Sequence, residues 1–413
     1  MDRIILHSDI NSCFANIECL YDPTLRGKPV SVCGSIEERH GIVLASTIEA
    51  KKCGVKTGEA IWQAKQKCPE LIVVEPHYDR YVRHSNMSRE IYSEYTDLVE
   101  PFGLDEAFLD ITGTSEDGER TANEIRQRIK FELGVTVSVG VSFNKIFAKL
   151  GSDMKKPDAV TMITRENFRE KVWPLAANEI LGVGRQTDKK LAMLGIRTLG
   201  ELAAADEVVM QKHFGKMGLT LKSFAMGGDI SPVMKFGTHH TVKSISNGTT
   251  PPRDLKTFED ARLVLLLLCE SVSQRMREQG FAAFVVHIYG RDTNLNTFQH
   301  QVKLDRPTDI SSELLDTAFS LLKQRWSFKA PLRSITVGVS ELVPSGIAQQ
   351  TSIFVDEAMR VKLEKLDTAI DEIRSRFGHY SIMRAVTHLD TGLGMIDARS
   401  EHVSYPVGYF HNQ

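Results

Sequence analysis

The sequence lacks the features that would place it at a membrane or outside the cell. No stretch of its 413 residues approaches the roughly 20 consecutive apolar residues of a membrane-spanning helix, and the longest apolar run covers only 263–269. Two charged residues, Asp2 and Arg3, precede a strand-like segment at the N-terminus, so we expect no signal peptide. These absences predict a cytoplasmic protein without membrane contact.

Cysteine is scarce, and its distribution argues against a disulfide framework. The six cysteines show no paired spacing typical of a metal site, and five lie in the first 70 residues, so we expect reduced thiols. An excess of one charge is missing too, because the net charge is −2, which argues against a simple basic nucleic-acid binder. Acidic residues predominate over 1–165 and basic residues over 231–345, although ordinary solvated faces would also produce this mild asymmetry.

What is present is a chain long enough for roughly two to four domains. Strands alternate with helices over 1–165, which indicates an α/β or α+β layer. Residues 166–230 have a purely helical pattern, and 235–341 follow the order βαββαβ, which predicts a ferredoxin-like sandwich. The tail 346–413 contains one clear helix near 356–377 and no evident strand core. The sequence contains no repeat.

Three carboxylates are the first candidates for chemistry. Asp9 closes the first predicted strand, and Asp105 and Glu106 follow Pro101 and Gly103 in a predicted hairpin. Side chains of neighbouring strand residues point to opposite faces, so adjacent carboxylates can meet only at a turn. If the hairpin pairs with the first strand, Asp9 joins the cluster.

A cluster of this kind needs a cation, because carboxylates held together repel one another. Oxygen ligands without imidazole or thiolate favour Mg²⁺ or Mn²⁺. Two such ions, ~3.5–4 Å apart, stabilise the attacking and leaving oxygens of a phosphoryl transfer. The run Leu-Asp-Glu-Ala over 104–107 is weak evidence by itself, since acidic hairpins are common at protein surfaces.

Several motifs in register make the pattern far more specific. They are DINSCFANIE at 9–18, LDEAFLD at 104–110, FNK at 143–145, AK at 148–149 and KKP at 155–157. Their order and spacing resemble the signature of the Y-family DNA polymerases across residues 1–345, with the bacterial DNA polymerase IV branch as the nearest type.

The resemblance implies an α+β multidomain protein, a right-hand polymerase with a ferredoxin-like palm. Its function would be template-directed DNA synthesis, in which deoxynucleotides are added to a primer 3′ end by two-metal phosphoryl transfer. Low fidelity, no proofreading and translesion synthesis are implied as well. The partners would be primer-template DNA and a dNTP, and we expect a monomer. The expected domains are a palm (1–20 and 77–165), fingers (21–76), a helix-hairpin-helix thumb (166–232), a βαββαβ little finger (235–345) and a tail (346–413).

The resemblance also assigns roles to single residues by position. Asp9, Asp105 and Glu106 would be catalytic and would bind two Mg²⁺ ions, for which Mn²⁺ can substitute, and the Ile10 carbonyl would be a further ligand. Glu106 would bind mainly the ion that activates the primer 3′-hydroxyl. Phe14 matches an aromatic steric gate that excludes a ribose 2′-hydroxyl, although a plain core phenylalanine is the alternative. The expected nucleotide-binding residues are Cys13, Phe14, Lys51 and Lys156.

Three residues depart from the family pattern. Ile48 and Lys51 stand where tyrosine and arginine commonly contact the triphosphate, so we expect weaker or differently arranged nucleotide binding. Asn11 replaces a frequent aspartate and is not expected to be an essential ligand. Gly103 replaces a serine and is expected to loosen the hairpin.

Other segments predict contacts with DNA and with a protein partner. Gly182 and Gly184 resemble a helix-hairpin-helix turn, whose backbone N–H groups can bind a phosphate at a helix start, although a plain helix-capping turn is the alternative. Four basic residues on or beside the strands of 231–345 could follow a phosphate backbone: Lys243, Arg291, Lys303 and Arg333. Gln350, Ile353 and Phe354 resemble a peptide that docks on a bacterial sliding clamp, or else form an apolar staple for the tail helix.

The sequence also leaves two other classes of function open. A non-catalytic scaffold that binds DNA and a clamp would not need intact carboxylates. A nucleotide cyclase also uses a palm with paired metals, but it has no use for the helix-hairpin-helix and little-finger segments.

Overall fold

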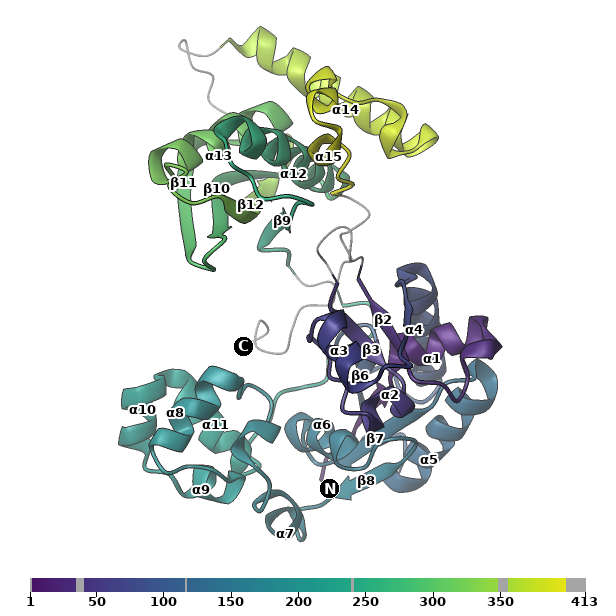
Figure 1. Ribbon diagram of the computed structural model, residues 1–413. Coiled ribbons are helices and arrows are strands. Elements are labelled where there is room, and N and C mark those ends of the chain that lie inside the picture. The colour runs from purple at the N-terminus through teal and green to yellow at the C-terminus, as the bar shows by residue number, and fades with distance from the viewer. Residues whose placement is uncertain (1, 35–40, 116, 239–240, 348–355, 399–413) are drawn as a thin grey trace. The chain divides into compact units, whose positions relative to one another are not determined.

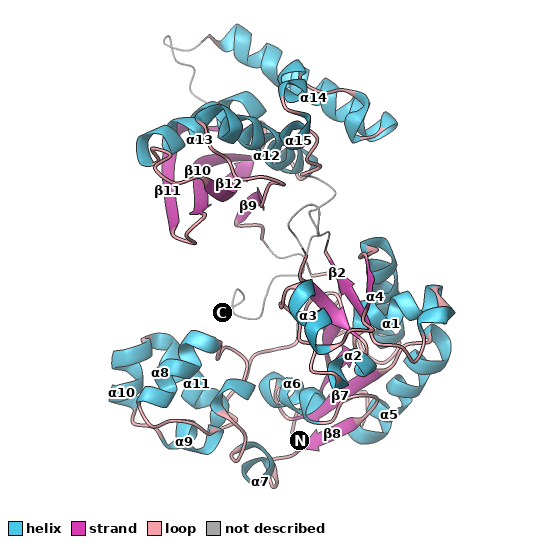
Figure 2. Ribbon diagram, viewed as in Figure 1, coloured by secondary structure: helices cyan, strands magenta, loops and turns pink. Residues whose placement is uncertain are grey.

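The computed structural model describes residues 2–34, 41–115, 117–238, 241–347 and 356–398. These residues form two compact units, the first within 2–34 and 42–238 and the second within 241–398. Figures 1 and 2 show their helices and strands.

A five-stranded sheet in the order β5-β6-β1-β7-β8 is the centre of the first unit. Strand β1 lies between β6 and β7 and is antiparallel to both, and β8 extends the sheet parallel to β7. The order of β5, β6, β1 and β7 confirms the ferredoxin-like palm. The strands are β1 (Ile5–Ile10), β5 (Val99–Pro101), β6 (Glu106–Asp110), β7 (Val137–Ser142) and β8 (Val160–Ile163).

Helices bury both faces of this sheet. Side chains of α1 (Cys13–Tyr21), α4 (Tyr78–Ser93) and α5 (Gly118–Arg128) form one core with it, and α6 (Lys145–Met154) joins another. Helix α6 crosses β7 so closely that a Cβ on Gly140 would lie 1.8 Å from the Ala148 carbonyl oxygen, so only glycine fits there. The predicted helix over 120–133 is interrupted, because a π-helical turn, η2 (Ile129–Leu133), follows α5.

A small sheet and a helical group complete the first unit. The sheet has the order β3-β2-β4 and packs against two short helices. The helical group confirms the purely helical pattern predicted for 166–230 and forms a continuous core with α6. The sheet elements are β2 (Val30–Cys33), β3 (Val43–Ser46), β4 (Ile72–Val74), α2 (Ile48–Lys52), α3 (Ile61–Lys67) and the 3₁₀ turn η1 (Pro23–Leu25). The helical group is α7 (Phe168–Val172), η3 (Ala177–Glu179), α8 (Arg185–Met193), α9 (Leu199–Ala204), α10 (Glu207–Phe214) and α11 (Lys216–Ala225).

The second unit has the predicted element order βαββαβ, but the predicted ferredoxin-like sandwich is wrong. Its antiparallel sheet runs β11-β10-β12-β9, so the second and fourth strands are central, where a ferredoxin-like sheet has the first and third. Hydrophobic alternation predicts which face of a strand is buried, but not which neighbour its edge pairs with. The elements are β9 (Ser244–Thr249), α12 (Phe258–Glu278), β10 (Phe281–Asp292), β11 (Thr297–Thr308), α13 (Ser311–Arg325) and β12 (Leu332–Pro344).

The described residues of the tail belong to the second unit. Its helix α14 (Glu357–Phe377) confirms the prediction, and η4 (His379–Ser381), η5 (Ala385–Leu389) and α15 (Thr391–Gly394) follow it. The guanidinium groups of Arg374 and Arg384 reach the buried Glu270 carboxylate of α12 at 3.0 and 2.6 Å. Three apolar residues after α14 enter the core of this unit: Leu393, Ile396 and Ala398. No helix in the described ranges is long and apolar enough to cross a membrane.

Candidate active site

The first predicted carboxylate, Asp9, lies near the end of the central strand β1. All six β1 residues are buried, and Asp9 is 6% exposed. After β1 the chain turns sharply into α1 through Ser12, which has a φ of 46°. The side-chain Nδ2 of Asn11 donates to the Ser138 hydroxyl at 2.9 Å, and its side-chain Oδ1 accepts from the Thr136 hydroxyl at 3.1 Å. Asn11 therefore ties the end of β1 to the β7 side of the sheet.

The hairpin brings the other two carboxylates to the same end of the sheet. Glu106 is the cross-strand partner of Asp9, and the Ile10 N–H donates to the Asp105 carbonyl at 2.9 Å. Gly103 has a φ of +96°, which suits glycine, and its carbonyl accepts from Arg89 at 2.8 Å. The predicted hairpin and its pairing with the first strand are confirmed.

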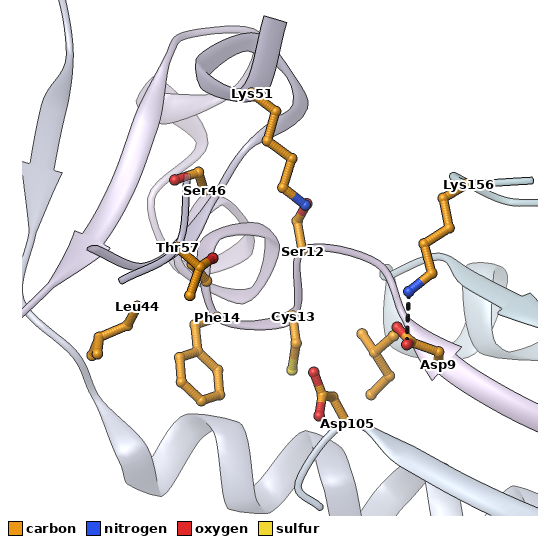
Figure 3. A pocket seen from close by; sticks show the side chains of 12 residues that line it. Asp9, Ser12, Cys13, Phe14, Leu44, Ser46, Lys51, Thr57, Asp105 and Lys156 are labelled. Atoms are coloured by element: carbon orange, nitrogen blue, oxygen red, sulfur yellow. Dashed lines mark hydrogen bonds and ion pairs between the residues drawn. The ribbon is translucent and has the colours of Figure 1, made fainter. Parts of the chain in front are cut away.

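Asp9 and Asp105 both line a pocket of about 250 Å³ (Figure 3). The pocket lies where the end of β1, the start of α1 and the small sheet with α2 meet, and Lys51 and Lys156 reach into it. It therefore combines acidic groups, basic groups and an aromatic ring. The lining residues are Asp9, Ile10, Ser12, Cys13, Phe14, Leu44, Ala45, Ser46, Lys51, Thr57, Asp105 and Lys156.

Lysines contact the acidic groups at and beside the pocket. Lys156 Nζ is 2.7 Å from Asp9 Oδ2, and Lys149 Nζ of α6 is 2.5 Å from Glu106 Oε2. Lys51 of α2 donates instead to the Ser12 hydroxyl at 2.9 Å. Asp9 thus has a cationic partner inside the pocket, whereas Glu106 is held from α6.

The pKa values of the carboxylates reflect this division. Burial raises the pKa of Asp9 to about 7 although Lys156 opposes the shift, and repulsion from Glu106 adds to it. Burial, and then repulsion from Glu106, also raise the pKa of Asp105. Burial opposes ionisation of Glu106 as well, but contacts with His7 and Lys149 hold its pKa at about 2. Negative charge is thus undercompensated at Asp9 and Asp105 and well compensated at Glu106.

Asp9 and Asp105 suit a divalent cation in their charge and in their oxygen donors. Asp9 and Asp105 offer hard oxygen donors in one pocket, which Ile10 also lines, and a cation there would relieve the raised carboxylate pKa values. Glu106 does not line the pocket. In the described part of the chain, no three or more His, Cys, Asp or Glu side chains form a group that could hold a metal ion. The structure therefore brings two of the three predicted carboxylates into one pocket and leaves Glu106 beside Lys149.

The predicted helix-hairpin-helix turn precedes α8. Gly182 has a φ of +96°, and the exposed Gly184 is the N-cap of α8. No side chain caps the N–H groups of this helix start. The turn thus leaves backbone donors at the surface, as a phosphate-binding turn requires.

The predicted DNA-contacting residues of the second unit lie on different parts of its sheet. Side chains alternate along β10, so Val286 and Ile288 lie in the core and Arg291 lies on the opposite face. Lys303 of β11 pairs with Val285 and therefore lies on the same face as Arg291. Lys303 Nζ contacts Glu341 Oε2 at 2.5 Å. Lys243 is exposed just before β9, and Arg333 is half-buried beside a bulge at the start of β12. The predicted clamp-binding residues, Gln350, Ile353 and Phe354, lie outside the described residues.

Sequence reasoning missed two groups of residues around the pocket. His7 is fully buried, with Nε2 3.3 Å from Glu106 Oε2 and Nδ1 2.8 Å from the Ser152 hydroxyl. Tyr81 of α4 is fully buried against Phe14. No spacing in the sequence pointed to these contacts, because each joins two residues more than 60 positions apart.

Comparisons with known proteins agree with this architecture. Residues 8–153 match the model of the impB/mucB/samB family, and residues 242–352 match the C-terminal domain of the same family. Residues 178–229 match the thumb domain of DNA polymerase-iota. A solved Y-family DNA polymerase chimera of Dbh and Dpo4 superposes with a TM-score of 0.72 at 25% identity, over 83% of this chain and all of that one.

Relatives of full length narrow the assignment. DNA polymerase IV of Acetivibrio thermocellus is 49% identical over 399 residues, which cover 96% of this chain and 100% of the relative. DNA polymerase IV 1 of Bacillus subtilis is 36% identical over 413 residues, which cover 100% of this chain and 98% of the relative. The chain therefore belongs to the Y family of DNA polymerases, within its bacterial DNA polymerase IV group. Membership implies that it depends on a divalent metal and binds DNA.

Proposed function

We propose that this translesion polymerase adds deoxynucleotides to the 3′ end of a primer in the pocket of Figure 3, with Asp9 and Asp105 as its principal catalytic residues. One observation carries the proposal: two undercompensated carboxylates, two lysines and the Phe14 ring line a single pocket of about 250 Å³. The lysines can bind a triphosphate, and the carboxylates can provide oxygen ligands to a metal. The Phe14 ring can contact the sugar.

The proposed metal ligands are Asp9, Asp105, Glu106 and the Ile10 carbonyl, and the proposed cofactor is two Mg²⁺ ions, with Mn²⁺ as a substitute. Bound divalent ions lower the pKa of the primer hydroxyl and neutralise charge on the pyrophosphate. The contacts of Glu106 with Lys149 and His7 both involve Oε2, and its second carboxylate oxygen, Oε1, would be the donor to a metal.

The proposed nucleotide-binding residues are Cys13, Phe14, Lys51 and Lys156. Lys156 and Lys51 attract the triphosphate as point charges. Cys13 and Phe14 open α1 and line the pocket, where the Phe14 ring would block a ribose 2′-hydroxyl. Lys51 donates to Ser12 and half-buried Ile48 has no donor, so this side of the triphosphate would be held less firmly than by an arginine and a tyrosine.

Primer-template DNA would be held by both units. In the first, the turn of Gly182 and Gly184 would bind a backbone phosphate at the start of α8, which has no side-chain cap. In the second, Arg291 and Lys303 share one face of the sheet, and Lys243 and Arg333 are further candidates.

The remaining predictions are also part of the proposal. They are a monomer in the cytoplasm, low fidelity without proofreading, and docking on a bacterial sliding clamp through Gln350, Ile353 and Phe354. The non-catalytic scaffold is disfavoured because Asp9 and Asp105, which a scaffold would not need, line the same pocket as two lysines and the Phe14 ring.

Primer extension tests the proposal. The purified chain, Mg²⁺ and a labelled primer-template should extend the primer by the nucleotide complementary to the template, without shortening it when nucleotides are withheld. Asp105→Ala should abolish extension, and Asp97→Ala, an exposed aspartate before the hairpin, should not. Equal extension by Asp105→Ala would overturn the mechanism. No extension by the unaltered chain, with DNA binding intact, would support a scaffold.

A further inference from the structure

The Phe14 ring has a rigid support. It lies flat on the ring of Tyr81 from α4, with centroids 4.2 Å apart and planes inclined by 7°. The Tyr78 ring meets Phe14 edge-on, with centroids 5.9 Å apart. Tyr81 is fully buried, so its own ring fixes how far Phe14 can lean away from the pocket.

Tyr81 is in turn anchored at its far end. Its hydroxyl donates to Glu18 Oε1 at 2.6 Å, and burial together with this hydrogen bond raises the pKa of Tyr81, so the hydroxyl keeps its proton. Glu18 is 2% exposed and also accepts from Arg80 at 2.7 Å, with His77 Nδ1 at 3.1 Å. A buried carboxylate with these partners cannot move without losing charge-assisted hydrogen bonds.

Phe14, Tyr81 and Glu18 form a closed chain of contacts. Phe14 and Glu18 lie four residues apart on α1, on the same face of that helix. Tyr81 spans both, with its ring against Phe14 and its hydroxyl on Glu18. Helix α1 therefore holds the pocket ring directly, and holds the support of that ring through Glu18.

We propose that Tyr81 and Glu18 are positioning residues that fix the Phe14 ring and so determine how strictly the enzyme excludes ribonucleotides. The proposal rests on the proposed function, in which Phe14 is the steric gate. If the Tyr81 hydroxyl loses its acceptor, the Tyr81 ring can slide, and Phe14 can tilt with it. A tilted Phe14 leaves room for a 2′-hydroxyl while the carboxylates and lysines of the pocket stay in place.

The test compares insertion of a dNTP and the matching rNTP opposite one template base by the full chain. Tyr81→Phe removes the anchoring hydroxyl and keeps the ring, and Glu18→Leu removes the acceptor. Each variant should raise kcat/KM for the rNTP about fivefold, which corresponds to the loss of roughly one hydrogen bond. The kcat/KM for the dNTP should stay within about twofold of that of the unaltered chain. Glu18→Gln keeps an oxygen for the Tyr81 hydroxyl and should retain most of the discrimination. Tyr81→Phe also removes the oxygen that accepts from the His77 N–H at 3.1 Å. The double variant Tyr81→Phe with Glu18→Leu should therefore lose no more discrimination than Tyr81→Phe alone, because the Glu18 contact is already absent in that variant.

Tyr95→Phe is the matched control, since its hydroxyl donates to Glu124 at 3.1 Å on an exposed surface. It should leave both rates unchanged. A gain in rNTP insertion cannot come from misfolding, and dNTP insertion by the same preparation reports folding. If Tyr81→Phe does not fold, Glu18→Leu decides the question.

Phe14→Ala, measured alongside, separates the two proposals. If it admits rNTPs but neither Tyr81→Phe nor Glu18→Leu does, the positioning proposal is overturned and the gate stands. If Phe14→Ala leaves sugar selectivity unchanged, Phe14 is not the steric gate. The gate assignment and the positioning proposal are then both overturned. Reduced dNTP insertion with no gain in rNTP insertion would give Tyr81 and Glu18 a structural role only and would also overturn the positioning proposal.

Discussion

Lys156→Met tests whether the pocket binds the triphosphate through its lysines. Lys156 Nζ lies 2.7 Å from Asp9 Oδ2, and the side chain is 36% exposed. A charge-assisted hydrogen bond contributes about 1.5–3 kcal/mol. Because more than a third of this side chain is exposed to solvent, we expect a smaller loss of about 1–2 kcal/mol, which corresponds to a five- to thirtyfold fall in kcat/KM for the dNTP.

The assay is steady-state insertion of one nucleotide at saturating Mg²⁺ with the dNTP concentration varied. The change should appear mainly as a higher KM, because Lys156 is proposed to bind the triphosphate. Lys155→Met is the control, since Lys155 is exposed at the end of α6 and does not line the pocket. If the two variants agree within twofold, the assignment of Lys156 to the triphosphate is refuted.

Three further predictions concern the nucleotide pocket and two buried ion pairs. Ile48→Tyr with Lys51→Arg should lower the KM for the dNTP about tenfold by adding a hydrogen bond and a bidentate contact, and an unchanged or higher KM would count against this account of α2. Lys145 and Glu100 form a buried ion pair with a distance of 2.7 Å. Lys145→Met should lower the free energy of unfolding in urea by about 3–5 kcal/mol, because it leaves the Glu100 carboxylate without its ion-pair partner. The double variant Lys145→Met with Glu100→Met should recover much of this loss, and a double variant as unstable as Lys145→Met would contradict the argument. Arg374→Met, which removes a buried partner of Glu270, should lower the melting temperature of the full chain more than Arg376→Met at an exposed position of α14, and equal shifts would show that the tail does not stabilise the second unit.

The sequence predicted the parts of the site that follow from strand geometry. A carboxylate at the end of the first strand and two more at a hairpin could converge only if the hairpin paired with that strand, and the register of Asp9 opposite Glu106 is that pairing. The contact between Glu106 and Lys149 was not predictable from spacing. It depends on where α6 places Lys149, 43 residues from Glu106 in sequence.

The same limit applies to larger features. The element order of the second unit followed from hydrophobic periodicity, but the neighbours of each strand did not. The segment after α14 has no long periodic pattern, yet Leu393 and Ile396 enter the core because the chain folds back onto α12. Tyr81 was visible in the sequence only as one more residue of a long helix. Its contact with Phe14 needs the packing of α1 against α4.

The most direct test of the central claim is single-turnover insertion by Asp105→Asn, with primer-template and dNTP at saturating concentrations and Mg²⁺ varied. Asp105→Asn keeps the shape of the side chain and removes the charge proposed to hold a metal. The rate should fall about a thousandfold or more, because metal-assisted stabilisation contributes several kcal/mol, whereas Asp97→Asn should match the unaltered chain. A rate for Asp105→Asn within about tenfold of the unaltered chain at every Mg²⁺ concentration would contradict the claim that this carboxylate holds the catalytic metal.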